Sequence, residues 1–268
     1  MKQICQILNI TRQAYYKQRR KTISESLSEE VIIEMVKEIR KKLPRIGGKK
    51  LYLMLKDEIA NLPIKLGRDK FFAILRRNNL LVQPTKRYAT TTNSFHRYKI
   101  YTNLISELTI TRANEVFVSD ITYIRLREDF CYLFLITDVY SRKIVGYYLS
   151  KNLLTEGALK AMRMAIRGKD VEGLIHHSDR GVQYCSNEYV KLLKKYKIEI
   201  SMGEAGNPYD NAIAERVNGI LKTEFYLGET FNDFTQAKKA VEQSIELYNN
   251  LRPHMSIDYL TPEQKYVA

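Results

Sequence analysis

The sequence predicts an α/β protein, with a mixed five-stranded sheet flanked by helices and an all-α region before it. Residues 115–150 contain three β-rich runs joined by short turns, and residues 155–203 then alternate helix with strand. Before them, residues 1–81 carry apolar positions at helical spacing. A chain of 268 residues has room for such a core and a smaller companion. We therefore expect three parts: a helical region over 1–81, a linker over 82–110 and a core over 111–268.

The net charge of +14 is unevenly distributed. Residues 1–110 carry 23 Lys or Arg against 9 Asp or Glu, whereas residues 111–268 carry 21 of each. This concentration favours a module that binds a polyanion such as DNA. A solvated basic surface without a partner is the alternative.

The composition excludes several other classes of protein. No run approaches the apolar length of a membrane span, and residues 1–20 lack the apolar core of a signal peptide. Cys5, Cys131 and Cys185 are scattered and form no zinc pattern. We expect a protein of the reducing cytoplasm with no membrane partner.

The first 81 residues predict a series of short helices. We expect two helices within 1–22 with Thr11 as an N-cap, then a helix that begins after Ser28 and is interrupted at Pro44 and Gly47–Gly48. Further helices are expected over 49–58 and 68–79, the last of them basic through Arg76 and Arg77. A trihelical unit with a basic final helix is typical of a helix-turn-helix reader of DNA. A small helical packing domain is the alternative. The polar, basic residues 82–110 form the expected linker along a phosphate backbone.

The core elements follow in a recognisable order. Strands are expected over 115–126, 130–140 and 143–150, then a helix over 155–168, a strand over 173–178, a helix over 187–197 and a strand over 198–203. Two long helices are expected to start near Tyr209 and Asp233. This order is the one expected of the RNase H-like fold.

Three acidic residues lie in settings that suit a metal site. Asp120 interrupts an apolar strand, where a lone carboxylate is costly to bury without a cation. Asp179 ends another strand, at the edge where α/β sheets place ligands, and Glu215 lies on a helix. Such carboxylates can be folded together around two divalent metal ions.

Helical phase supports the role of Glu215. Asn211, Glu215, Asn218 and Lys222 fall within an arc of roughly 60° on one helix face. The opposite face carries Ile213, Val217, Ile220 and Leu221. The helix is therefore predicted to pack through its apolar face and to present the glutamate and the lysine.

Other polar residues compete for roles at this site. Asp138 is the main alternative to Asp120, but its position before Ser141–Arg142 favours a structural role in that turn. With four histidines and no paired cysteines, zinc lacks a ligand set. His176 and His177 are instead expected to support Asp179 or contact DNA, with a plain structural role left open. Arg180 opens the loop that follows Asp179.

These motifs resemble a known family. The matching segments are 120–124, 137–138, 141–146, 176–181, 183–184, 207–208, 210–212, 215, 221–222, 248–249, 252–254 and 261–262. Together they are similar to the OrfB-type transposase of the IS-three insertion-sequence family, which carries a retroviral-integrase catalytic core. The likeness covers nearly the whole chain. The usual tryptophan before the first aspartate is missing, since the chain has no Trp.

The resemblance implies a site and a set of partners. Asp120, Asp179 and Glu215 would form an Asp-Asp-Glu triad with two Mg²⁺ ions, for which Mn²⁺ can substitute. The DNA-contact candidates are Lys222, Asn211, Asn218, Arg180, His177, Arg76 and Arg77. The resemblance also implies a homo-oligomer on DNA, action at the bacterial nucleoid, and a fusion with the product of an upstream reading frame.

The expected function is therefore a DNA transposase that binds insertion-sequence ends, cleaves DNA and joins the 3′-hydroxyl end to another strand. Two alternatives stay open: a DNA-binding regulator with an idle core, and a generic RNase H-like nuclease. A strand-transfer assay separates the three, because only a transposase gives joined products.

Overall fold

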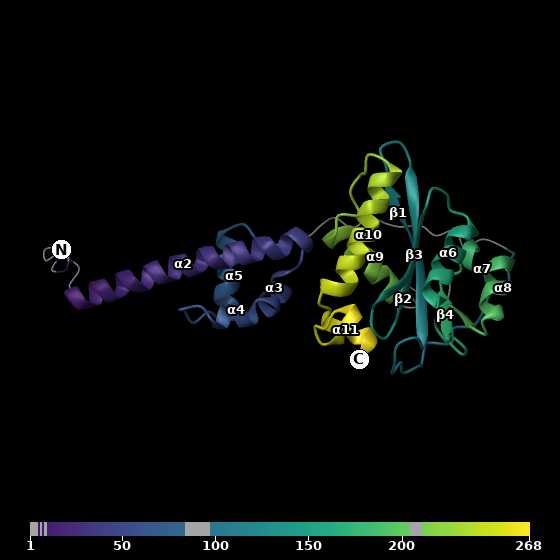
Figure 1. Ribbon diagram of the computed structural model, residues 1–268, viewed down its shortest axis with the longest axis horizontal. Coiled ribbons are helices and arrows are strands. Elements are labelled where there is room, and N and C mark those ends of the chain that lie inside the picture. The colour runs from purple at the N-terminus through teal and green to yellow at the C-terminus, as the bar shows by residue number, and fades with distance from the viewer. Residues whose placement is uncertain (1–4, 6, 8–9, 84–96, 204–210) are drawn as a thin grey trace. The chain divides into compact units, whose positions relative to one another are not determined.

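The computed structural model describes residues 5, 7, 10–83, 97–203 and 211–268 (Figure 1). The chain divides into two compact units, Met1–Pro84 and Thr85–Ala268. Within the described residues, no helix is long and apolar enough to cross a membrane.

The first unit is helical and contains α2 (Arg12–Lys42), α3 (Gly48–Met54), α4 (Lys56–Ala60) and α5 (Arg68–Arg77). The Thr11 side chain accepts a hydrogen bond from the Ala14 N–H, so the predicted N-cap is confirmed. The predicted break at Ser28 is wrong. The Ser28 hydroxyl donates to the Ser24 carbonyl within a continuous helix, and α2 contains no glycine or proline to end it.

A small apolar core holds the first unit together. Ile32 and Val36 of α2, Leu51 of α3, and Phe71 and Leu75 of α5 are each 0% exposed. Each of these buried side chains contributes roughly 1.5–3 kcal/mol to the stability of the unit, before the loss of chain entropy on folding is subtracted. Most of the Lys and Arg side chains of this unit are exposed.

The second unit is built on a five-stranded sheet, as predicted. The strands are β1 (Val116–Arg125), β2 (Phe130–Asp138), β3 (Ile144–Ser150), β4 (Ile175–Ser178) and β5 (Glu199–Met202), in the order β3-β2-β1-β4-β5. The first three form an antiparallel meander, and β4 and β5 run parallel to β1. This mixed sheet has the strand order of an RNase H-like fold.

Helices cover both faces of this sheet (Figure 1). On one side lie α6 (Thr155–Ile166), α7 (Val182–Cys185) and α8 (Asn187–Lys195), and on the other lie α9 (Ala212–Glu224), α10 (Phe234–Leu251) and α11 (Pro262–Val267). A 3₁₀ turn, Met255–Ile257, precedes α11. The start predicted near Tyr209 lies outside the described residues, while Asp233 caps α10 as expected.

Side-chain alternation along β1 decides which residues meet α9. Phe117 belongs to the large core cluster that includes α6 and α8. Val116 and Val118 instead pack with Ala214 of α9. Because successive strand residues point to opposite faces, Asp120 shares the face of Val116 and Val118. The sheet therefore directs Asp120 toward the helix that carries Glu215.

One close approach depends on glycine. A Cβ at Gly146 of β3 would lie 2.3 Å from the Ala161 carbonyl oxygen and 2.7 Å from the Ala165 Cβ. A residue with a side chain would force α6 away from the sheet. Gly146 therefore sets the spacing between β3 and α6.

Candidate active site

Strand register places two aspartates side by side. In the parallel pair of β1 and β4, Ser119 is the partner of Ser178. The next residue on each strand is an aspartate, Asp120 on β1 and Asp179 just after β4. Neighbouring strands are about 4.8 Å apart, so consecutive residues after a paired position stay adjacent. The sheet thus brings together two carboxylates that are 59 positions apart in the sequence.

Both carboxylate oxygens of Asp120 are held by hydrogen bonds. Oδ1 accepts from the Ile121 N–H at 2.8 Å, and Oδ2 accepts from the Asn218 side-chain amide at 2.6 Å. Burial and, after it, the negative charge of Asp179 raise the pKa of Asp120 to about 7, with a smaller contribution from Glu215. The two hydrogen bonds oppose this shift because they favour the charged form. The three acids therefore share one electrostatic environment.

Asp179 is fixed by the turn that follows it. Its Oδ1 accepts from the Gly181 N–H at 2.9 Å, and a Cβ at position 181 would lie 2.9 Å from the same oxygen. The Arg180 Nε donates to the Gly203 carbonyl at 2.9 Å. A glycine at 181 thus leaves room for the Asp179 carboxylate, which remains partly exposed.

Glu215 is exposed and lies in the first turn of α9, whose N-cap is Asn211. The positive end of the helix dipole favours a carboxylate there. Lys222, two turns later, is partly buried; burial lowers its pKa, and the charge of Asp120 opposes that effect. The predicted face of α9 therefore does lie toward Asp120.

The two asparagines of this face are bound to β1. Asn218 is 5% exposed and donates to Asp120, and Asn211 is 9% exposed and donates to the Ser119 carbonyl at 3.1 Å. Both had been predicted as DNA contacts. In the structure both side chains are nearly buried and are hydrogen-bonded to β1, while their contact with DNA stays a prediction.

A layer of polar side chains lies beneath the aspartates. The His176 Nε2 is 2.7 Å from the Ser119 hydroxyl and 3.2 Å from the Tyr189 hydroxyl. Burial lowers the pKa of His176 to about 3, with a smaller effect from His177, so the ring is neutral. These hydrogen bonds join β1, β4 and α8 next to the Ser119–Ser178 pair. Tyr189 was not predicted to take part, because only its position on a helix next to the sheet can be recognised in the sequence.

His177 takes part in a second bond of this layer. Its Nδ1 is 2.8 Å from the Ser201 hydroxyl of β5, which also accepts from the Leu104 N–H at 2.9 Å. His177 is 0% exposed. A side chain without exposed surface cannot contact DNA, so that prediction is corrected to a structural role.

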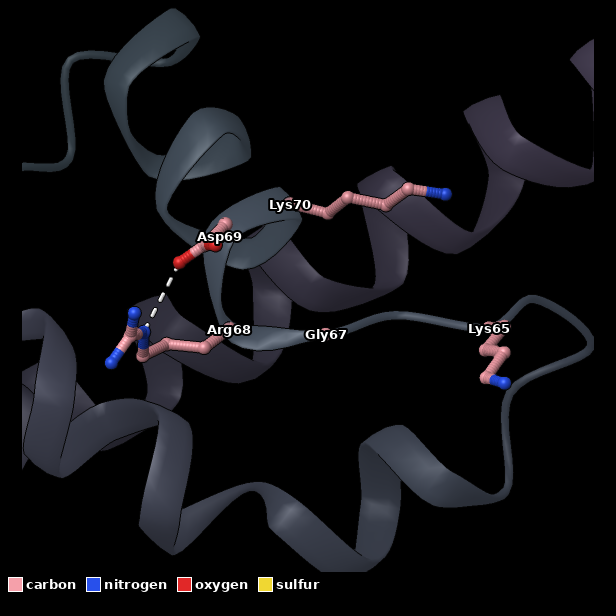
Figure 2. Close-up of a pocket in the computed structure, with 5 residues that line it drawn as sticks. All are labelled: Lys65, Gly67, Arg68, Asp69 and Lys70. Carbon is pink, nitrogen blue, oxygen red and sulfur yellow. Dashed lines mark hydrogen bonds and ion pairs between the residues drawn. The ribbon is translucent and has the colours of Figure 1, made fainter.

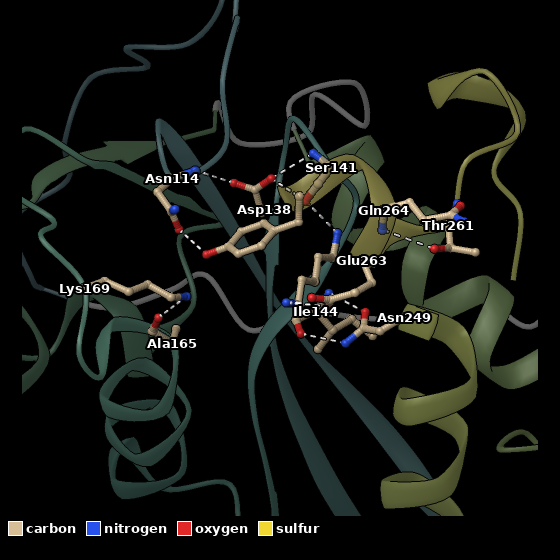
Figure 3. A network of polar contacts seen from close by, with 12 residues as sticks. Asn114, Asp138, Ser141, Ile144, Ala165, Lys169, Asn249, Thr261, Glu263 and Gln264 are labelled. Atoms are coloured by element: carbon tan, nitrogen blue, oxygen red, sulfur yellow. Dashed lines mark hydrogen bonds and ion pairs between the residues drawn. The ribbon is translucent and has the colours of Figure 1, made fainter. Parts of the chain in front are cut away.

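Both carboxylate oxygens of Asp138 accept hydrogen bonds from residues near the turn at Ser141 (Figure 3). Its Oδ1 accepts from the backbone N–H and the hydroxyl of Ser141, and its Oδ2 accepts from the Asn114 N–H at 2.8 Å. Burial raises the pKa of Asp138, and these hydrogen bonds oppose the shift. With its oxygens occupied in this way, Asp138 fits the structural role expected for it better than that of a metal ligand.

The donor chemistry of the three acids fits Mg²⁺ better than a softer metal. Carboxylate oxygens are the ligands that Mg²⁺ and Mn²⁺ prefer. In the part of the chain that the structure describes, no three His, Cys, Asp or Glu side chains are gathered closely enough to form a ready ligand cluster. The register of β1 and β4 nevertheless brings Asp120 next to Asp179, whose negative charge raises the pKa of Asp120.

Basic residues also gather on the first unit. Lys65, Arg68 and Lys70 line a pocket at the start of α5, where Arg68 pairs with Asp69 (Figure 2). Further along α5, Arg76 is exposed. Arg77 instead pairs with Glu29 of α2 at 2.5 Å. Of the two predicted DNA contacts on this helix, only Arg77 forms an ion pair with an acidic residue among the described residues.

Several known proteins are similar to this chain in sequence. Residues 110–208 and residues 196–262 each match a family described as "Integrase core domain". The chain is 32% identical to "Insertion element IS600 uncharacterized 31 kDa protein" of Shigella sonnei, over 97% of this chain and 96% of that protein. It is also 30% identical to "Transposase InsF for insertion sequence IS3A" of Escherichia coli strain K12, over 98% of this chain and 93% of that one.

A solved structure supports the fold. The chain is similar to a component of the cryoEM structure of the simian T-cell lymphotropic virus intasome in complex with PP2A regulatory subunit B56 gamma, with a TM-score of 0.51 and 18% identity. The match covers 86% of this chain and 74% of that chain. At this identity the likeness concerns the fold alone.

Proposed function

The chain belongs to the IS3 family of insertion-sequence transposases, which carry an integrase core domain, and we propose that it binds insertion-sequence ends, cleaves the DNA and joins the 3′-hydroxyl end to another strand. The observation that carries this proposal is the register of β1 and β4. It sets Asp120 beside Asp179, and α9 brings Glu215 into the same electrostatic environment.

In the proposed mechanism, Asp120, Asp179 and Glu215 would hold two Mg²⁺ ions, for which Mn²⁺ could substitute. Bound ions of this kind activate a water or a DNA 3′-hydroxyl for attack and stabilise the leaving oxygen. Lys222 places a cation beside Asp120 and would bind the phosphate next to the scissile bond. Arg180, in the turn after Asp179, is a second candidate for backbone contact.

We assign DNA binding to the helical unit and the linker that follows it. Arg76 on the exposed face of α5 and the cations around the start of that helix are suited to phosphate contact. We further propose that the protein acts as a homo-oligomer on DNA at the bacterial nucleoid. It would recognise the insertion-sequence ends fully when it is fused to the product of the upstream reading frame.

The test is a strand-transfer assay with labelled DNA from the flanks of the gene and Mg²⁺. Asp179→Asn should abolish cleavage and joining while leaving DNA binding within about twofold, because only a metal ligand is lost. Asp170→Asn is the matched control, since Asp170 is an exposed aspartate of the same unit. Both the isolated chain and a form fused to the upstream product should be assayed.

The alternatives predict different results. Cleavage without any joined product would favour a nuclease, and DNA binding with neither reaction in either form would favour a regulator. Residual Mg²⁺-dependent joining by Asp179→Asn would contradict the assignment of the triad.

A further inference from the structure

Asn218 lies next to Glu215 on α9 and is hydrogen-bonded to Asp120. It follows Glu215 by three residues, so the two side chains are neighbours on α9. Its Nδ2 lies 2.6 Å from Asp120 Oδ2, and the residue is 5% exposed. A carboxylate accepts hydrogen bonds and an amide nitrogen donates them, so this contact fixes which way the amide faces.

The contact restricts the carboxylate of Asp120. Asn218 holds Oδ2, while the Ile121 N–H holds Oδ1 at 2.8 Å. With one donor on each oxygen, the carboxylate cannot rotate without losing a charge-assisted hydrogen bond. Each oxygen still keeps a further lone-pair site for another partner.

We propose that Asn218 is a positioning residue that orients the Asp120 carboxylate for metal binding and ties it to the helix that carries Glu215. The inference rests on the proposed function, because it assumes that Asp120 is a metal ligand. Partners that orient a metal ligand in this way typically change metal affinity 10–100-fold when they are removed.

Asn211 strengthens the argument, since it fixes the start of the same helix. Its amide donates to the carbonyl of Ser119, the residue before Asp120. Consecutive residues of β1 are thus bound by two amides of α9, two turns apart. Of these two asparagines, Asn218 is the one that bonds a carboxylate, so it is the one that acts on the rotation of Asp120.

The experiment measures metal binding without relying on activity. The melting temperature of the full chain is followed as Mg²⁺ or Mn²⁺ is titrated from a metal-free start, which gives an apparent dissociation constant. Asn218→Leu removes the donor at similar volume, and Asn218→Ser is a smaller variant in case the first fails to fold. The control is Asn249→Leu, because Asn249 is 9% exposed and bonds both the N–H and the carbonyl of Ile144 on β3.

We expect the Asn218 variants to need roughly 10–100 times more metal, and Asn249→Leu to lose stability with its metal affinity within about twofold of the original. DNA affinity without metal should stay within about twofold for every variant. Unchanged metal affinity in the Asn218 variants would overturn the inference, as would lost DNA affinity with metal affinity retained, which would make Asn218 a DNA contact. If the unaltered chain shows no metal-dependent stabilisation that Asp120→Asn removes, the metal site of the proposed function fails, and the inference with it.

Discussion

Replacing Asp120 by Asn should stabilise the metal-free protein at pH 8. Burial, the charge of Asp179 and a smaller contribution from Glu215 raise the pKa of Asp120 to about 7, against about 3.9 in an unfolded chain. Between about pH 4 and pH 7, the folded state therefore retains a proton on Asp120 that the unfolded state has released. Folding is penalised progressively as the pH rises from about 4 to 7, and the penalty is constant above that range. The uncharged amide of an asparagine at position 120 removes this penalty.

The size of the effect follows from the shift. A change from 3.8 to about 7 corresponds to at most roughly 4 kcal/mol. Asp120 keeps partial solvent contact, so we expect about 2 kcal/mol, or about 4–8 °C in melting temperature for a unit of this size. The new asparagine side chain at position 120 also keeps its hydrogen bond to Asn218. The Asn218 amide can flip, so that its Oδ1 accepts from the side-chain N–H of the new asparagine. In the part of the chain that the structure describes, that oxygen has no partner now.

The assay is calorimetry of both proteins in chelator at pH 8 and at pH 4.5. The difference in melting temperature at pH 4.5 reports changes in packing and hydrogen bonding, since most of the charge effect is gone there. The increase in that difference between pH 4.5 and pH 8 reports the carboxylate. Added Mg²⁺ should then stabilise only the protein with Asp120. A difference that stays constant with pH would refute the reasoning.

Three further outcomes are expected. Gly146→Ala should lower the free energy of unfolding by about 1–3 kcal/mol in urea titrations, because its Cβ would meet the Ala161 carbonyl at 2.3 Å. Glu224→Ala should cost about 3 kcal/mol by the same measurement, since Arg252 is 2% exposed and loses bonds of 2.7 and 2.8 Å to that carboxylate. Arg76→Ala should weaken DNA binding uniformly across sequences and reduce the salt-dependence slope by about 1 in filter-binding assays.

The sheet was predictable because its strands carry their own signals. Apolar runs bounded by turns located β1 to β3 to within a few residues, and the change to alternating helix and strand indicated the parallel additions. The first unit was harder. Ser28 looks like an N-cap in isolation, but a serine can also donate to the carbonyl four residues earlier, and only the surrounding helix decides between the two bonds.

For the candidate site, helical periodicity predicted which residues share one face of α9 but not what that face contacts. Helical phase correctly grouped Asn211, Asn218 and Glu215 on one face, yet phase does not say what that face meets. Two of these side chains meet β1 and one is exposed. The bond of His176 to Tyr189 likewise depends on how α8 packs against β4, which no local pattern specifies.

The electrostatics of the site argue for a divalent ion and against compensation by the protein's own cation. Lys222 lies close enough to Asp120 for the two charges to interact, but burial is the larger effect on both groups, lowering the pKa of the lysine and raising that of the aspartate. Each charge is therefore disfavoured where it lies, and neither relieves the other fully. Asp179 and Glu215 add further negative charge near the same carboxylate. A bound ion of charge +2 would remove the repulsion among the acids and the penalty at Asp120 together, so the instability expected of the metal-free protein is free energy that metal binding can recover.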